Sequence, residues 1–273
     1  MLGKYLDNLR KNGALIHNIT NYVTVNDVAN VLLASGASPV MADEPEDAVE
    51  ITAICGGLNI NIGTLNKNSI KAMFAAGQKA QELGHKMVLD PVGVGASTLR
   101  TKTALDLMKE FRFDVIKGNT SEIKVLFSGK GGAVGVDADI NDKITDENFD
   151  KSIEFVKAFA KETKGIIAVT GAIDLVCDEN RCFVIRNGRK EMSQITGTGC
   201  MLSALIAAFL VANPDHPLEA TAAAVCMMGV AGEIGWENME DGDGNSTYRD
   251  RLIDAIYNMT GNRLDRGAIY EDR

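Results

Sequence analysis

The sequence predicts an α/β fold with a mainly parallel central sheet, flanked by helices and carrying an antiparallel edge. Three observations support this prediction. Short apolar runs alternate with longer helical patterns, as in a series of βαβ units. The short runs are apolar on both faces, which is typical of strands in a parallel sheet covered on both sides. The last two predicted strands read as a hairpin, so the sheet should end antiparallel.

Five short runs are the expected parallel strands, because each is too short for a helix and turn-forming residues bound them. They are Ser38–Met41, Leu58–Gly63, Lys86–Pro91, Phe113–Asn119 and Gly165–Gly171. The hairpin is expected within Asp174–Gly188, with its turn at 178–180. No linker or internal repeat divides the chain, so we expect one domain over residues 1–273.

Helices are expected over 24–36, 66–84 and 101–111. Thr24, with Asp27 three residues later, is predicted to cap the first of these, and Gly36 to end it. After Gly199 the chain reads as helical throughout. The segment 128–137 is rich in glycine but lacks the order of a Walker A motif, so we expect a loop there.

The composition excludes several classes of function. With 37 acidic and 28 basic residues the net charge is −9, and no basic run interleaves with aromatic residues, so a nucleic-acid partner is not expected. The apolar segments 200–212 and 218–236 read as buried helices rather than membrane spans, and no secretion signal is evident. The five cysteines include no CxxC pair, which favours free thiols and a cytoplasmic location.

Polar residues at the strand ends mark the expected functional edge of the sheet. In an open α/β sheet, ligands bind beyond the carboxyl ends of the strands. The residues at these ends are Met41, Gly63, Asp90, Asn119 and Thr170. Several polar groups should therefore converge on one edge of the sheet.

Two carboxylates are candidates for a metal site. Asp90 ends a strand before a proline and two nearby glycines, so it could hold a metal or water, or could only cap the loop. Glu122 lies in the first turn of the helix after Asn119 and could point toward a Mg²⁺–phosphate site. The alternative for Glu122 is a capping box with Asn119, which the pattern favours. Lys117, just before, could neutralise phosphate.

The stretch Gly197-Thr198-Gly199-Cys200 opens the longest apolar helix. Backbone amides at a helix start favour an anion, and a transferring phosphoryl group develops charge that such amides stabilise. The alternative is that the glycines only form a tight turn. Cys200 has no other cysteine or histidine at metal-ligand spacing, so a metal role for it is not expected. His17 reads as a hydrogen-bonded structural residue.

Taken together, these stretches resemble the hydroxyethylthiazole kinase family, thiamine-salvage enzymes of the ribokinase-like superfamily. The matching stretches, in the family's order, are HNITNYVTVNDVANVLLASGASPVM, LNINIGTL, LDPVGVGAS, KGNTSEI, AVTGAIDLV and TGTGC. The resemblance runs from about Leu15 to at least Val230. Several coincident motifs are far more specific than any one of them.

The resemblance implies ATP-dependent phosphorylation of the primary alcohol of 5-(2-hydroxyethyl)-4-methylthiazole, with Mg²⁺, by a homotrimer whose thiazole sites lie between subunits. The implied roles are an anion hole at Gly197, Thr198, Gly199 and Cys200; thiazole contacts at Asn21, Val23, Met41 and Gly197; ATP contacts at Lys117, Asn119 and Thr170; and carboxylates around Mg²⁺ at Asp90 and Glu122.

Two positions bear on how the family mechanism carries over. Lys117 stands where the family more often has arginine; lysine keeps the charge but loses bidentate contact. Cys200 stands where many ribokinase-like kinases have an aspartate base. An ordinary thiol is a weak base at neutral pH, but phosphoryl transfer depends mostly on positioning and charge stabilisation.

Three alternatives stay open at this level. The chain could be a kinase for another small alcohol such as a hydroxymethylpyrimidine, although the segment from Asn21 to Met41 favours the thiazole. It could be an ATP-dependent repair dehydratase for hydrated nicotinamide nucleotides, against which Cys200 counts. It could also be a non-catalytic nucleotide-binding module, which would not need both carboxylates and the helix-start glycines.

Overall fold

The computed structural model of the chain describes residues 1–129, 144–145 and 147–273. The expected glycine-rich loop at 128–137 lies almost entirely outside these residues. Within them, the strands form one nine-stranded sheet in the order β2-β1-β3-β4-β5-β6-β7-β8-β9. The strands are β1 (Leu15–Ile19), β2 (Ser38–Met41), β3 (Gly57–Asn61), β4 (Lys86–Asp90), β5 (Val115–Asn119), β6 (Ile166–Thr170), β7 (Asp174–Cys177), β8 (Cys182–Ile185) and β9 (Tyr270–Asp272).

The pairing confirms the predicted sheet. The strands β2, β1, β3, β4, β5 and β6 run parallel, and β7, β8 and β9 extend the sheet in antiparallel pairs. Two strands were not expected. The first is β1, which contains two polar residues, His17 and Asn18, whose side chains are both buried. The charged strand β9 corrects the prediction that the chain is helical to its end.

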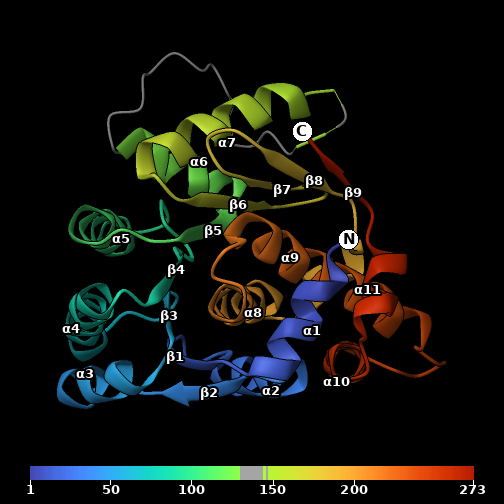
Figure 1. Cartoon of the computed structure of the whole chain (residues 1–273), viewed down its shortest axis with the longest axis horizontal. Coiled ribbons are helices and arrows are strands. Elements are labelled where there is room, and N and C mark those ends of the chain that lie inside the picture. Colours follow the sequence, from blue (N-terminus) through green and yellow to red (C-terminus); the bar gives the residue numbers. More distant parts are fainter. Residues whose placement is uncertain (130–143, 146) are drawn as a thin grey trace.

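Helices cover both faces of the sheet, and Figure 1 shows the sheet curling around α8 and α9. One face packs against α1 (Gly3–Asn12), α2 (Val25–Ser35), α8 (Thr198–Ala212), α9 (Pro217–Glu237), α10 (Asn245–Tyr257) and α11 (Gly261–Gly267). The other face packs against α3 (Pro45–Ile54), α4 (Lys67–Leu83), α5 (Thr98–Glu110), α6 (Thr120–Gly129) and α7 (Phe149–Thr163). Each face therefore has its own hydrophobic core.

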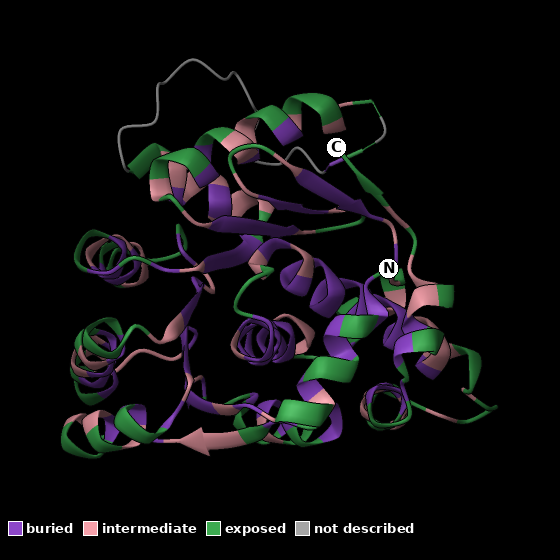
Figure 2. Cartoon of the chain, viewed as in Figure 1, coloured by how far each residue is buried: buried purple, intermediate pink, exposed green. Residues whose placement is uncertain are grey.

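The helices α8 and α9 form the centre of the first core. Most residues of both are buried, as Figure 2 shows, which explains why they are largely apolar. By length and composition α9 could cross a membrane, but most of it is buried inside the fold. This agrees with the prediction of two buried helices.

Helix ends were predicted with mixed success. Asn66 caps α4 through a capping box, close to the expected start. The predicted side-chain cap at Thr24 is wrong, because the Thr24 hydroxyl donates to Asn21 Oδ1 at 3.1 Å instead of capping α2. The helix α5 begins three residues before the expected Thr101, because the Ser97 side chain caps it.

The expectation of five free thiols is wrong for one pair. Cys177 and Cys182 lie directly opposite each other in the β7–β8 hairpin, with 4.1 Å between their Cα atoms, and form a disulfide. Cys55, Cys200 and Cys226 are free and buried.

Candidate active site

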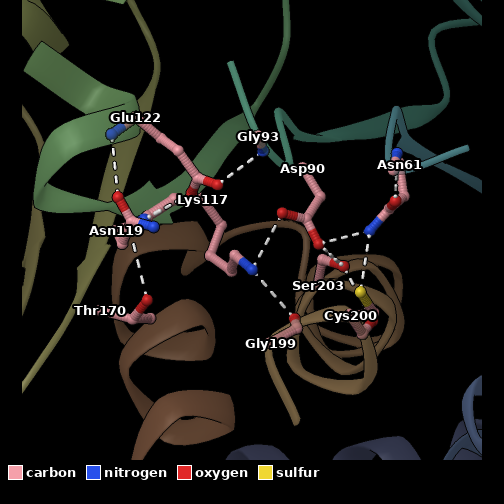
Figure 3. A network of polar contacts seen from close by, with 12 residues as sticks. Asn61, Asp90, Gly93, Lys117, Asn119, Glu122, Thr170, Gly199, Cys200 and Ser203 are labelled. Atoms are coloured by element: carbon pink, nitrogen blue, oxygen red, sulfur yellow. Dashed lines mark hydrogen bonds and ion pairs between the residues drawn. The ribbon is translucent and has the colours of Figure 1, made fainter. Parts of the chain in front are cut away.

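Polar residues near the ends of neighbouring strands face the start of α8. Asn61 of β3 is in register with Asp90 of β4, and Asn119 of β5 with Thr170 of β6. Their apolar neighbours along these strands pack into the core on the opposite face. The predicted convergence of polar groups on one edge is therefore confirmed, and Figure 3 shows it from close by.

The two glycines at the start of α8 are required by packing. Gly197 has φ +88°, and a Cβ built on it would lie 2.3 Å from Thr24 Cγ2. A Cβ on Gly199 would lie 3.1 Å from Lys117 Nζ. The tight-turn interpretation is therefore correct, and it does not exclude an anion site. The first N–H groups of a helix have no acceptor within it, and Gly197 has no side chain that could cap them.

A cavity of about 480 Å³ opens beside this helix start. Its walls come from the end of β6, the start of β7, the segment 187–193, and the inner sides of α8 and α9. The polar lining residues include Thr170, Asp174, Asn187, Arg189, Lys190, Ser193 and Thr198, and the apolar ones include Met192, Leu202, Val225 and Met228. An apolar wall with anion-binding amides at one end suits a nucleoside phosphate.

Asp90 and Lys117 form a buried ion pair in which Lys117 Nζ lies 3.0 Å from Asp90 Oδ1. The same ammonium donates to the Gly199 carbonyl at 3.0 Å (Figure 3). Burial acts to lower the pKa of Lys117, but the Asp90 carboxylate, with Cys200 and Glu122, outweighs it and raises that pKa. Lys117 therefore carries a charge that the protein itself balances, and its contact with ATP stays a prediction.

Glu122 forms the capping box that the sequence favoured. Glu122 N–H donates to Asn119 Oδ1 at 2.9 Å, and Asn119 N–H donates to Glu122 Oε2 at 2.8 Å. The other carboxylate oxygen accepts from Gly93 N–H at 2.8 Å. Burial raises the pKa of Glu122, although these amides and Lys117 oppose the rise. Asn119 is therefore a helix cap here, and its predicted contact with ATP is untested.

A divalent cation fits better beside Glu122 than beside Asp90. Glu122 is only partly buried, and a nearby cation would offset the burial that raises its pKa. Asp90 is fully buried, and its two oxygens face Lys117 on one side and the donors of Asn61 and Ser203 on the other. Mg²⁺ usually binds one or two carboxylates and keeps several waters. Glu122 fits that role directly, and Asp90 fits it only if Lys117 moves.

Cys200 lies in the first turn of α8, and its sulfur accepts two side-chain N–H bonds. The Nδ2 groups of Asn21 and Asn61 each lie 3.2 Å from Cys200 Sγ. The thiol is buried, yet its neighbours in the chain, Thr198 and Gly199, line the cavity. The sulfur is therefore held as a hydrogen-bond acceptor close to the helix-start amides.

Of the residues predicted to contact the thiazole, only some lie beside the start of α8. Asn21 contacts Cys200, and Thr24 of the same loop packs against Gly197, so this loop does reach the start of α8. Val23 is 64% exposed. Met41 ends β2 beside Asn18 of β1 and is partly buried. The substrate contacts of Val23 and Met41 stay predictions.

Two residues of the network were missed. Asn61 is buried and donates to both Asp90 and Cys200, and Ser203 donates to Asp90 Oδ2 at 3.0 Å. A signal for each was present in the sequence. Asn61 alternates with isoleucine in a buried strand, where a polar residue needs a hydrogen-bond partner. Ser203 follows Cys200 by three residues, so Ser203 and Cys200 lie on the same face of α8.

Comparisons with known proteins agree with this geometry. A family model for the hydroxyethylthiazole kinase family matches residues 6–262. A hydroxyethylthiazole kinase of Clostridium acetobutylicum is 57% identical over 271 residues, 99% of each chain. The structure of a hydroxyethylthiazole kinase protein from Pyrococcus horikoshii is similar at a TM-score of 0.88 and 35% identity, covering 100% of this chain and 98% of that one. A ribokinase-like superfamily protein from Enterococcus faecalis shares the fold, with a TM-score of 0.62 at 14% identity over 92% and 88% of the two chains. The chain belongs to the hydroxyethylthiazole kinase family.

Proposed function

We propose that this chain transfers the γ-phosphoryl group of ATP to the primary alcohol of 5-(2-hydroxyethyl)-4-methylthiazole, a step of thiamine salvage. One observation carries the proposal. The uncapped first turn of α8, with Cys200 in it, adjoins both a cavity of nucleoside size and the buried pair of Asp90 and Lys117. Family membership names the acceptor alcohol, because the relatives with high identity are hydroxyethylthiazole kinases.

The transfer follows from these positions. The nucleoside fills the cavity, and its phosphates extend toward the amides of Thr198, Gly199 and Cys200. The substrate oxygen attacks the γ-phosphorus as the bond to the bridging oxygen breaks, and ADP leaves with that oxygen. The amides stabilise the charge on the transferring group. The hydroxyl proton passes to the Cys200 sulfur or to solvent water.

Glu122, with Asp90 behind it, would hold Mg²⁺. The ion would neutralise phosphate charge and orient the triphosphate. Within this chain, the capping box holds the Glu122 carboxylate at the helix start, and the amide of Gly93 fixes its second oxygen.

The remaining parts of the proposal come from the family. Asn21, Val23, Met41 and Gly197 would line the thiazole site, and Lys117 and Thr170 would meet ATP. The exposed Val23 suits a site completed by a second subunit of a homotrimer. We also propose that residues 1–273 act as one kinase domain in the cytoplasm.

A coupled ADP-release assay with ATP, Mg²⁺ and the thiazole alcohol tests the proposal. We expect ADP release that depends on the alcohol and yields its phosphate. A parallel panel contains a hydroxymethylpyrimidine and hydrated NADH. ADP release with the pyrimidine alone, or dehydration of the hydrate, would assign one of the alternative activities. ATP binding without turnover of any alcohol would point to a binding module.

A further inference from the structure

Asn61 joins three parts of the candidate site. Its Nδ2 group donates to Asp90 Oδ2 at 2.7 Å and to Cys200 Sγ at 3.2 Å (Figure 3). Its Oδ1 accepts from Asn21 Nδ2 at 3.1 Å and from Gly63 N–H at 2.9 Å. The side chain is 1% exposed, so it makes these contacts without competition from bulk water. One amide thus connects the end of β4, the start of α8 and the loop that follows β1.

The contacts fix which way the amide points. A reversed amide would place Oδ1 against the Asp90 carboxylate and would lose the bond from Gly63 N–H. The neighbouring amide is fixed in the same way, because Asn21 Oδ1 accepts from Val23 N–H at 3.1 Å. Both Nδ2 groups therefore face the sulfur, and the sulfur can only accept from them.

We propose that Asn61 is a positioning residue that sets Asp90 and Cys200 in one fixed arrangement for phosphoryl transfer. The inference rests on the proposed kinase function. Asn61 acts through its two partners: it aims the Asp90 carboxylate toward Lys117 and holds the Cys200 sulfur at the mouth of α8 as an acceptor for the substrate hydroxyl. Groups that orient reacting residues in this way typically change activity by about 10- to 100-fold when removed.

The same strand offers a matched control. Asn59 lies two residues before Asn61 on the same face of β3, is fully buried, and donates to Asn18 Oδ1 at 3.1 Å. We expect Asn61→Ser to lower kcat by roughly 30-fold with little change in KM for ATP, while Asn59→Ser changes kcat less than about threefold. Thermal melting of both variants measures any loss of fold. Asn61→Leu keeps the side-chain volume and removes both N–H donors without adding charge, so it serves if the serine variant does not fold.

A double-mutant cycle separates positioning from a merely structural role. If Asn61 acts through the sulfur, Asn61→Ser costs clearly less kcat in a Cys200→Ala background than in the wild-type chain. Equal costs in both backgrounds would overturn the link to Cys200. Equal losses of kcat in Asn59→Ser and Asn61→Ser would overturn the positioning role altogether.

A measurement without substrate keeps this inference distinct from the proposed function. The rate at which iodoacetamide alkylates Cys200 is measured at a single pH, with Cys200→Ala as the blank. Asn61→Ser removes an N–H donor from the sulfur and should change this rate, whereas Asn59→Ser should leave it unchanged. A changed rate in a chain that phosphorylates no alcohol would contradict the kinase proposal alone. An unchanged rate in an active kinase would contradict the Asn61 inference alone.

Discussion

Replacing Lys117 with methionine removes the ammonium that faces Asp90 and keeps most of the side-chain volume. In the wild-type chain the two side chains are 5% and 0% exposed, and the ammonium lies 3.0 Å from the carboxylate. The variant leaves a carboxylate inside the protein with no cation beside it. Breaking a buried pair in this way costs about 3–5 kcal/mol.

The structure places the expected loss near the lower end of that range. Asn61 and Ser203 still donate to Asp90 Oδ2 in the variant, so one oxygen keeps its hydrogen bonds. We therefore expect unfolding free energy to fall by about 3 kcal/mol at pH 7. At roughly 2–4 °C per kcal/mol this lowers the melting temperature by about 10 °C.

Differential scanning calorimetry at pH 7 measures this loss. The double variant Lys117→Met/Asp90→Asn has no buried charge, so it should regain most of the stability. Lys117→Arg keeps the charge and should lose less stability than Lys117→Met. Activity should separate from stability: the double variant should stay inactive, because it lacks the cation that we propose meets the phosphates. A loss below about 1 kcal/mol for Lys117→Met, or a double variant as unstable as the single one, would refute the reasoning.

Substitutions at three further positions, Gly197, Cys200 and Asp174, test other parts of the site. Gly197→Ala combines a left-handed φ of +88° with a Cβ that would lie 2.3 Å from Thr24 Cγ2. Thermal melting should therefore show a loss of more than about 2 kcal/mol in unfolding free energy, and kcat should fall at least about tenfold. The control is Gly242→Ala, with φ +93° and open space around it, which should cost only about 1 kcal/mol and leave kcat unchanged. Cys200→Ser should retain appreciable activity and Cys200→Asp should be active in the ADP-release assay; loss of all turnover by a folded serine variant would favour an essential thiolate. Burial raises the pKa of Asp174 to about 7. Between about pH 4 and pH 7 this carboxyl group is therefore protonated in the folded chain and ionised in the unfolded chain, so stability falls as pH rises through that window. Asp174→Asn should flatten this part of the melting profile, and an unchanged slope would exclude Asp174 as its source.

Features set by neighbours in the chain were predictable from the sequence. The capping box of Asn119 and Glu122 was predicted because both partners lie within one turn and the pattern is local. The β7–β8 hairpin was likewise read from its turn residues. Five of the parallel strands were predicted from short apolar runs between helices, because a strand that is buried on both faces consists almost entirely of apolar residues.

Features set by long-range contacts were not predictable in the same way. The partners of Lys117 are Asp90 and the Gly199 carbonyl, 27 and 82 positions away, and no local pattern records such pairings. The Thr24 cap failed although its partner is local, because its hydroxyl donates to Asn21, three residues earlier, instead of accepting from the first turn of its own helix. The strand β1 was not predicted, because its polar side chains find partners far away in the sequence. His17 contacts Thr52 and the Ala42 carbonyl, and Asn18 Oδ1 accepts from Asn59.

The pattern of charges explains why a thiol suits position 200. Asp90 and Lys117 already neutralise each other inside the protein, and two amides supply donors to the residue at position 200 without adding charge. An aspartate there would accept the same two N–H bonds but would add a second carboxylate two hydrogen bonds from the first, through Asn61. A cysteine adds no second carboxylate beside this pair, so the phosphates that we propose at the helix-start amides meet no carboxylate at position 200. Cys200→Asp should therefore turn over and bind ATP less tightly than the wild-type chain, whereas an ATP affinity equal to or above that of the wild type would show that the charge at position 200 does not reach the phosphates.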